Sequence, residues 1–263
     1  MHVAELTYPG TRIDLPDLTQ AHALYSLLLM IEQKVTEASV ALNLFEAACA
    51  QSTMRHSRDE WERNAERRRE LMAKYERQRP ADDTGFPDPS RYAEMHYQAD
   101  VETKREDWLA GRPPHAYQHV LPFLHAKTFL YAVDSIGKLI RALSQADGAP
   151  AATALHDESF GQSFPTLRAV RNSAQHVEDR IRGLGRGGQP LQLRPVQNQL
   201  VSAPAGGVLI IDSLNSNKFG GTLANGEYGE VEVSIAGLER ARDVVQALID
   251  SFLWKGPKRH YPS

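Results

Sequence analysis

The chain has 263 residues, a formal net charge of −3 and a single cysteine, Cys49. This charge excludes a global basic field that recruits nucleic acid, so any such binding needs a local patch. One cysteine excludes an internal disulfide bond and a cysteine-rich zinc cluster. No stretch approaches the ~20 apolar residues of a membrane span, and residues 1–17 lack a signal-peptide pattern. We therefore expect a cytoplasmic protein with no membrane partner.

The spacing of apolar residues predicts two long core helices. Residues 1–17 contain prolines and a glycine and should form an extended lead-in. A helix should then run over 19–51, capped by Thr19, with apolar residues at helical spacing over a wide arc. A second core helix is predicted over 115–146, where Pro122 marks its start or a kink. These helices predict a mostly α protein built as a helical bundle.

Residues 54–112 are densely charged and are predicted to be a helical excursion from that bundle. Two polar helices, at about 54–79 and 90–109, should be joined by a proline-rich loop at 80–89. The first helix carries the arginine run 67–69 beside a narrow apolar stripe. That stripe consists of Trp61, Ala65, Met72 and Tyr75. The arginines fit two interpretations: a solvated helix with one packed edge, or a face that contacts phosphates.

The pattern changes from helical to β after residue 190. Glycines at 183, 185 and 188 match G-x-G-x-x-G, but they follow a helix and open none, so we reject a dinucleotide-binding loop. A β insertion at about 190–234 should contain a small antiparallel meander at about 207–234. Its strands are predicted at 208–212, 219–223 and 230–234, with turns at 214–217 and 225–226.

An amphipathic helix over 235–253 should close the bundle, and the basic tail at 255–263 should be frayed. The apolar positions of this helix are spaced for one buried face. The whole chain, 1–263, is thus predicted to be a single helical domain with a charged excursion and a β insertion.

The stretch from Ser163 to Arg182 is predicted to be one amphipathic helix, capped by Ser163 and ended by Gly183. One side should face the core. Its members are Phe164, Leu167, Val170, Ala174, Val177 and Ile181. The opposite side gathers polar groups at about 100° per residue. Its members are Arg168, Asn172, His176 and Asp179. An arginine, an amide, an imidazole and a carboxylate on one exposed stripe suggest chemistry.

The segment Arg171-Asn172-Ser173-Ala174-Gln175-His176 resembles the R-x4-H motif of HEPN domains. The resemblance covers the helical body, roughly 19–182, and the last helix, whereas the β meander and the charged region depart from it. It implies a HEPN-like helical bundle and metal-independent RNA cleavage without a cofactor, by a toxin or defence-type endoribonuclease. It also implies a homodimer, and an antitoxin protein as a further partner.

The roles of the residues follow from the resemblance and from their chemistry. His176 ionises near neutral pH and can act as acid or base, while Arg171 can clamp phosphate oxygens. Asn172 can orient the ring or the phosphate, and we assign Arg168 and Arg180 to substrate binding. Residues five apart on an ideal helix point about 140° apart. The long Arg171 side chain can therefore curl around the helix, or act on the site of the partner subunit, or share its role with Arg168.

Two alternatives to the nuclease remain open from the sequence. The same stretch can be a salt-bridged surface of a catalytically inactive HEPN-like bundle that serves as a binding or assembly module. It can also sense a small molecule or nucleotide through its arginine and histidine face. His115 and His119 are four residues apart, a spacing that can hold a metal, but no H-E-x-x-H motif supports this, so we assign no metal site.

Overall fold

The computed structural model describes residues 1–52, 58–78 and 89–262. It divides the chain into two compact units, one made of Met1–Glu46 and Pro122–Ser263 and the other of Ala47–Leu121. The loop predicted at 80–89 lies almost entirely outside the described residues, as does the start of the helix predicted at 54–79. Among the described helices, none combines the length and apolar character that a bilayer crossing requires.

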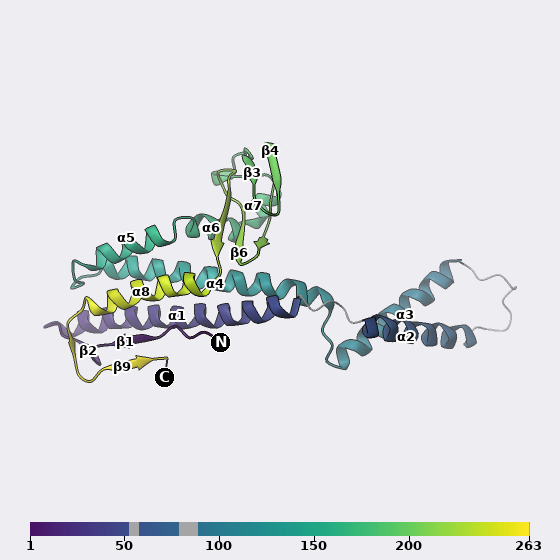
Figure 1. The fold of residues 1–263 in the computed structure, drawn as a ribbon, viewed down its shortest axis with the longest axis horizontal. Coiled ribbons are helices and arrows are strands. Elements are labelled where there is room, and N and C mark those ends of the chain that lie inside the picture. Colours follow the sequence, from purple (N-terminus) through teal and green to yellow (C-terminus); the bar gives the residue numbers. More distant parts are fainter. Residues whose placement is uncertain (53–57, 79–88, 263) are drawn as a thin grey trace. The chain divides into compact units, whose positions relative to one another are not determined.

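The larger unit is built on three helices that run side by side, α1 (Leu18–Ser52), α4 (His115–Ser144) and α8 (Ile235–Asp250) (Figure 1). Their apolar faces form the core, as the spacing predicted. The buried members include Leu28, Ile31, Leu42, Phe129, Ile136, Ile140, Leu238, Val245 and Leu248. The mostly α fold class is therefore confirmed, and helix bounds lie close to those predicted.

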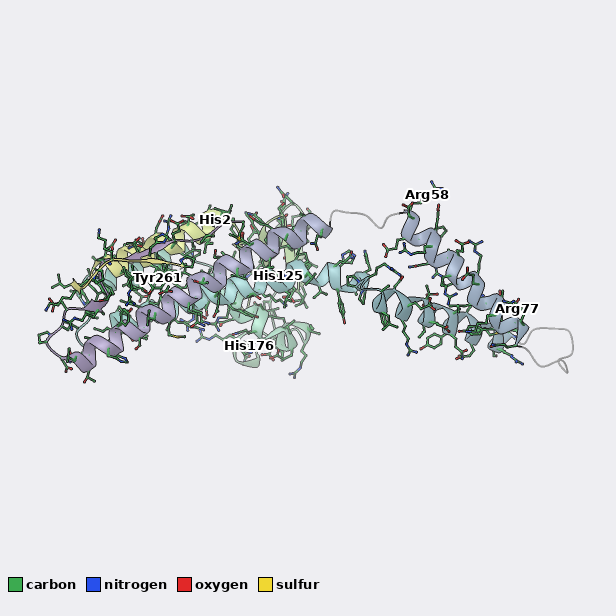
Figure 2. The ribbon with its side chains drawn as sticks, turned by 90° about the horizontal axis from the view of Figure 1, so that it is seen from below. His2, Arg58, Arg77, His125, His176 and Tyr261 are labelled. Atoms are coloured by element: carbon green, nitrogen blue, oxygen red, sulfur yellow. The ribbon has the colours of Figure 1, made fainter. Side chains whose placement is uncertain are left out.

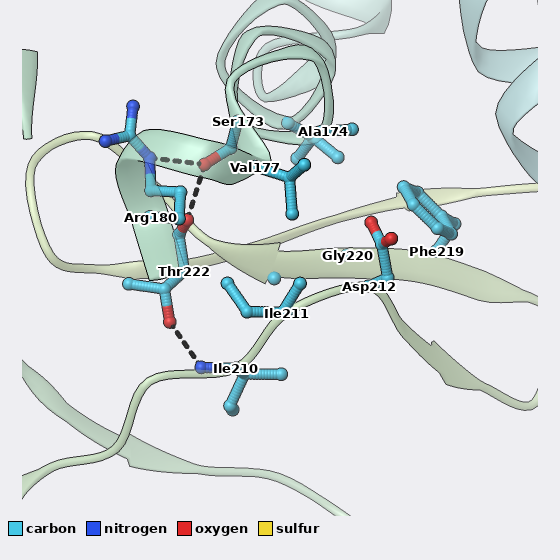
Figure 3. Close-up of a pocket in the computed structure, with 12 residues that line it drawn as sticks. Ser173, Ala174, Val177, Arg180, Ile210, Ile211, Asp212, Phe219, Gly220 and Thr222 are labelled. Carbon is cyan, nitrogen blue, oxygen red and sulfur yellow. Dashed lines mark hydrogen bonds between the residues drawn. The ribbon is translucent and has the colours of Figure 1, made fainter. Parts of the chain in front are cut away.

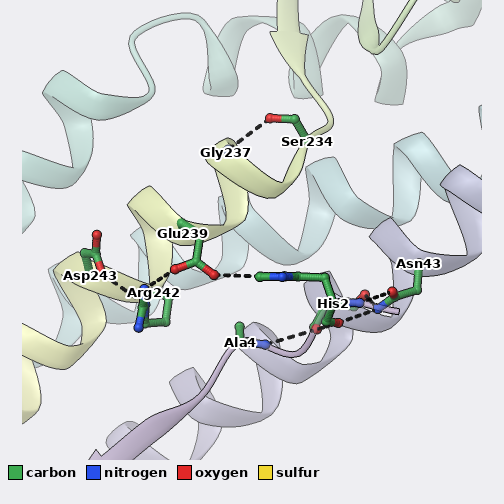
Figure 4. Close-up of polar contacts among 9 residues, drawn as sticks. His2, Ala4, Asn43, Ser234, Gly237, Glu239, Arg242 and Asp243 are labelled. Carbon is green, nitrogen blue, oxygen red and sulfur yellow. Dashed lines mark hydrogen bonds and ion pairs between the residues drawn. The ribbon is translucent and has the colours of Figure 1, made fainter.

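The first helix begins at a different cap from the one predicted. Asp17 Oδ1 accepts hydrogen bonds from the backbone N–H groups of Thr19 at 2.8 Å and Gln20 at 3.2 Å, so Asp17 satisfies the first free donors of α1. The last helix starts as the sequence suggests, because the Ser234 hydroxyl accepts from the Gly237 N–H at 3.0 Å (Figure 4).

A further helix, α5 (Thr153–Ser163), packs on the bundle and was not predicted. Its Phe160 ring lies against Gly137 of α4, where a Cβ atom would meet the ring at 2.7 Å. The absence of a side chain at Gly137 therefore lets α5 approach α4 closely. This approach forms one wall of a groove described below.

The smaller unit contains a hairpin of two helices, α2 (Arg58–Arg77) and α3 (Pro89–Leu109). The predicted excursion thus has a core of its own. Its members are Leu71, Met72 and Ala99, with Tyr75 and Met95 packed against them. The predicted apolar stripe is wrong at Trp61, which is 64% exposed, and it omitted Leu71, which is buried.

The β insertion contains a three-stranded antiparallel sheet in the order β5 (Ser213–Asn215), β6 (Lys218–Thr222), β7 (Tyr228–Glu232). The strand predicted at 208–212 is wrong. That segment instead contacts the end of β6 through two hydrogen bonds. The Ile210 N–H donates to the Thr222 hydroxyl, and the Thr222 N–H donates to the Ile210 carbonyl. The first turn is consequently tighter than predicted and lies between β5 and β6. A separate pair, β3 (Pro195–Gln197) and β4 (Ser202–Gly207), precedes the sheet.

Both ends of the described chain form strands that pair with each other. β1 (Leu6–Tyr8) pairs with β9 (Arg259–Tyr261), and β2 (Arg12–Ile13) pairs with β8 (Trp254–Lys255), all antiparallel. The lead-in is extended, as predicted, whereas the prediction of a frayed tail was wrong because the tail pairs with it. Aromatic packing across the strands explains the pairing, because the Tyr8 ring centroid lies 5.4 Å from those of both Trp254 and Tyr261.

Polar contacts fix His2, which precedes β1 in the chain. The backbone N–H of His2 donates to Asn43 Oδ1 of α1 at 2.6 Å, and the His2 ring lies 2.6 Å from Glu239 Oε1 of α8 (Figure 4). Glu239 also pairs with Arg242 on its own helix. His2 therefore links α1 to α8.

Candidate functional site

The stretch from Ser163 to Arg182, predicted to be one helix, is divided between the end of α5 and two short helices. Ser163 ends α5 instead of capping a new helix, α6 runs over Leu167–Gln175, and α7 runs over Val177–Ile181. His176 joins the last two with φ −112° and ψ 45°, outside the helical region. The chain therefore changes direction at the histidine of the R-x4-H segment.

Tertiary hydrogen bonds explain this change of direction. The buried Ser173 hydroxyl donates to the Thr222 carbonyl of β6 at 2.5 Å and accepts from Arg180 Nε at 3.0 Å (Figure 3). The Arg180 guanidinium also donates to the Leu184 carbonyl. Arg180 is only 4% exposed, whereas Ile181, predicted to face the core, is 65% exposed. A turn at His176 is what brings Arg180 of α7 inward to Ser173.

Arg180 thus has a structural position and not the surface position expected of a substrate-binding residue. A cavity of about 10 Å³ lies beside this network, lined by apolar side chains such as Val177 and Ile211 (Figure 3). It has room for about one water molecule and not for a ligand. The interior between α6, α7 and β6 is therefore a packing interface.

Arg171 is held by a carboxylate on another helix. Its Nε lies 3.0 Å from Asp134 Oδ2 of α4, and the side chains are 13% and 8% exposed. The Arg171 Nε–H finds no hydrogen-bond acceptor among the described residues, so the contact is an ion pair without hydrogen-bond geometry. Arg171 Nη1 donates to Gln175 Oε1 at 2.8 Å, and Lys138 Nζ lies 2.7 Å from the same Asp134 oxygen. The guanidinium is therefore fixed in position.

Arg168 and Arg171 line one groove, of about 200 Å³, between α4, α5 and α6. Asn172 and His176 do not line it. The sequence placed Arg168, Asn172 and His176 on one face of a continuous helix, and this geometry fails because His176 is not helical. The structure therefore brings the two arginines together and separates the histidine from them.

His176 lies at the surface of the α6–α7 segment, with a side chain that is 58% exposed (Figure 2). Its Nδ1 is 3.5 Å from Glu178 Oε1. The Asn172 side chain makes no hydrogen bond with any described residue, so the predicted orienting contact to the ring is not formed. His176, Glu178 and Asp179 present atoms within 4.8 Å of one another and could together hold a metal ion.

The arginines of α2 are matched by carboxylates of α3. Arg67 makes a bidentate contact with Glu106, at 2.8 and 2.7 Å, and Arg68 lies 3.3 Å from Asp100. The hydrogen bonds from Arg67 lower the pKa of the Glu106 carboxyl. These contacts favour the solvated-helix interpretation over a phosphate-contacting face.

The sequence analysis missed Asp134, Lys138 and Arg141, which line the groove from α4. Their spacing, four and then three residues, was the available signal, because it places them on one face of a helix. The sequence around these residues did not indicate that this face of α4 lies opposite Arg171, and the third wall of the groove, α5, was not predicted.

No protein-family model, curated protein or solved structure matches this chain.

Proposed function

We propose that the chain is a HEPN-like endoribonuclease that cleaves RNA without a metal ion, with His176 as the proton-transfer group. The observation that carries this proposal is the exposure of His176 at a non-helical break in the R-x4-H segment, whose first residue, Arg171, has a fixed guanidinium. An exposed imidazole can reach a substrate, and histidine is the side chain most often used for proton transfer in catalysis. A fixed guanidinium loses little conformational freedom when it binds phosphate.

The reaction is attack of the ribose 2′-oxygen on the adjacent phosphorus, which breaks the bond to the 5′-oxygen of the next nucleotide. A base removes the 2′-hydroxyl proton, and an acid protonates the departing 5′-oxygen, which yields a 2′,3′-cyclic phosphate. One imidazole supplies one of these groups. A homodimer would supply the second from the His176 of the other subunit. Arg171 would stabilise the charge that builds up on the phosphate oxygens.

The competing proposal is a catalytically inactive HEPN-like bundle that serves as a binding or assembly module. It is favoured by the use of Ser173 and Arg180, both within this stretch, in packing against β6. Glu178 beside His176 also repels phosphate. In this case neither an RNA target nor an antitoxin protein is needed to explain the motif.

Cleavage of RNA in EDTA separates the two proposals. The wild type should cut, and His176→Ala should lose about 100-fold or more in rate, since general acid–base catalysis contributes 10²–10⁴-fold. His22→Ala, which removes an exposed histidine on α1, is the matched control and should retain activity. Products should carry 2′,3′-cyclic phosphate ends. Equal cleavage by all three proteins would identify a contaminant and support the inactive module.

A further inference from the structure

The groove between α4, α5 and α6 combines an apolar floor with a charged rim. Phe160, Phe164 and Leu167 supply the floor and are all at most 8% exposed. Such a floor excludes water, and charges beside it interact more strongly than charges in bulk solvent. The groove lies wholly within the larger unit and does not include His176.

Cations outnumber carboxylates at this groove. The rim carries Lys138, Arg141, Arg168 and Arg171 against Asp134 and Asp157. The chain as a whole has a formal net charge of −3, so the groove is a local positive site on an acidic protein. A local excess of this kind is what a small anion requires.

The two carboxylates are already engaged, and one guanidinium is not. Asp134 Oδ2 contacts both Arg171 and Lys138, and Asp157 Oδ2 lies 3.1 Å from Arg141 Nε. The exposed Arg168 makes no ion pair or side-chain hydrogen bond with any part of the chain that the structure describes. Its five N–H donors therefore remain available at the rim.

We propose that this groove is a phosphate-binding site in which Arg168 donates to the anion and Lys138 and Arg141 complete its charge. A guanidinium matches phosphate oxygens through paired N–H donors. The volume of about 200 Å³ is below the ~300–1,000 Å³ of pockets that hold drug-sized ligands, so it suits a phosphate group with a small substituent. The site goes beyond RNA cleavage, because it depends on these charges and not on His176.

Gly161 of α5 offers a variant that changes the charge of the groove without removing a contact. It lines the groove, and a Cβ atom added there would have nothing within 4 Å. Gly161→Glu therefore introduces a carboxylate, and Gly161→Gln introduces a neutral side chain of the same size. The pair separates a charge effect from a steric one.

Binding should be measured in the His176→Ala background, so that cleavage does not consume the probe. The probes are inorganic phosphate, followed by nuclear magnetic resonance, and a labelled oligoribonucleotide with a 5′-phosphate or a 5′-hydroxyl, followed by fluorescence anisotropy. Arg168→Gln should weaken phosphate binding about tenfold, the value of one charge-assisted hydrogen bond. Gly161→Glu should weaken it at least as much, whereas Gly161→Gln should not.

Arg182→Gln is the control for the general loss of a positive charge, because Arg182 is exposed and lies outside the groove. Dependence on Arg168 for the 5′-phosphorylated probe alone would identify a terminal phosphate as the ligand. Dependence for both probes would identify a backbone phosphate. The proposal is overturned if no phosphate binding is detected, or if Arg182→Gln weakens it as much as Arg168→Gln. Phosphate binding without RNA cleavage would retain the groove and reject the nuclease.

Discussion

The α2–α3 hairpin and the α4–α6 groove both carry several arginines, but the two regions use them differently. In the hairpin, Arg67 and Arg68 each face a carboxylate of the opposite helix, and these side chains are between 34% and 41% exposed. In the groove, Asp134 is nearly buried and serves two cations, while Arg168 has no partner among the described residues. Arginine density in the sequence is highest in the hairpin, where Arg63 and Arg105 also make no ion pair with a described residue. In the groove, by contrast, the unmatched Arg168 lies beside three further cations. The gathering of cations around an unmatched arginine, and not arginine density, therefore marks the candidate anion site.

The largest expected effect is that of Asp134→Asn. The substitution leaves the Arg171 guanidinium, 13% exposed, without its counterion, and breaking a buried pair in this way costs about 3 kcal/mol of unfolding free energy. The matched change in the hairpin, Asp100→Asn, should cost under about 1 kcal/mol, because its pairs are exposed.

Amide hydrogen exchange can measure these two changes separately, because it reports α4 and α3 as individual segments. Faster exchange in α4 for the first variant and little change in α3 for the second would support the comparison. Equal changes in both helices would break it.

A smaller effect is expected for Ser173→Ala. It removes the acceptor of Arg180 Nε and the donor to the Thr222 carbonyl, both buried, which should cost about 2 kcal/mol. Ser135→Ala is the control, because the one hydrogen bond of the Ser135 hydroxyl to a described residue is the one it donates to the Tyr131 carbonyl of its own helix. Urea denaturation of both variants measures the difference. A loss no larger than that of the control would show that the serine does not hold α6 to the sheet.

The smallest expected effect concerns Glu32, a carboxylate that forms no ion pair with any described residue. Burial raises the pKa of Glu32, although the Tyr8 hydroxyl opposes the shift. Ionisation is thus costlier in the folded state, so Glu32 lowers stability as pH rises through its raised pKa. Asp100 behaves oppositely, since its hydrogen bond with Lys104 lowers the pKa and its contribution is lost as pH falls.

Glu32→Gln should therefore stabilise the protein more at pH 8 than at pH 4, when unfolding free energies of both proteins are measured at each pH. The penalty that the variant removes is absent below the ordinary pKa of a glutamate and complete above the raised one. An equal difference at both pH values would show that burial does not control this group.

The sequence predicted the elements whose cause is local and missed those whose cause is distant. In α1, α4 and α8 the apolar residues recur at helical spacing within each segment, so these helices were predicted well. The break at His176 depends on Thr222, and the groove depends on Asp134, both on other elements. Arg168 and Arg171 were selected from their own helix, but helical angles could not reveal that His176 leaves it.

The pairing of β1 with β9 has a consequence for the order of folding. Leu6 and Tyr261, which face each other across the two strands, are separated by most of the chain. Closing so long a loop costs more conformational entropy than joining α2 to α3, so the hairpin can form early and this pairing late. We expect β1 and β9 to be the last strands to acquire protection during refolding. Until they pair, the aromatic side chain of Tyr8 stays accessible to other unfolded chains, which makes this interval the one most exposed to aggregation.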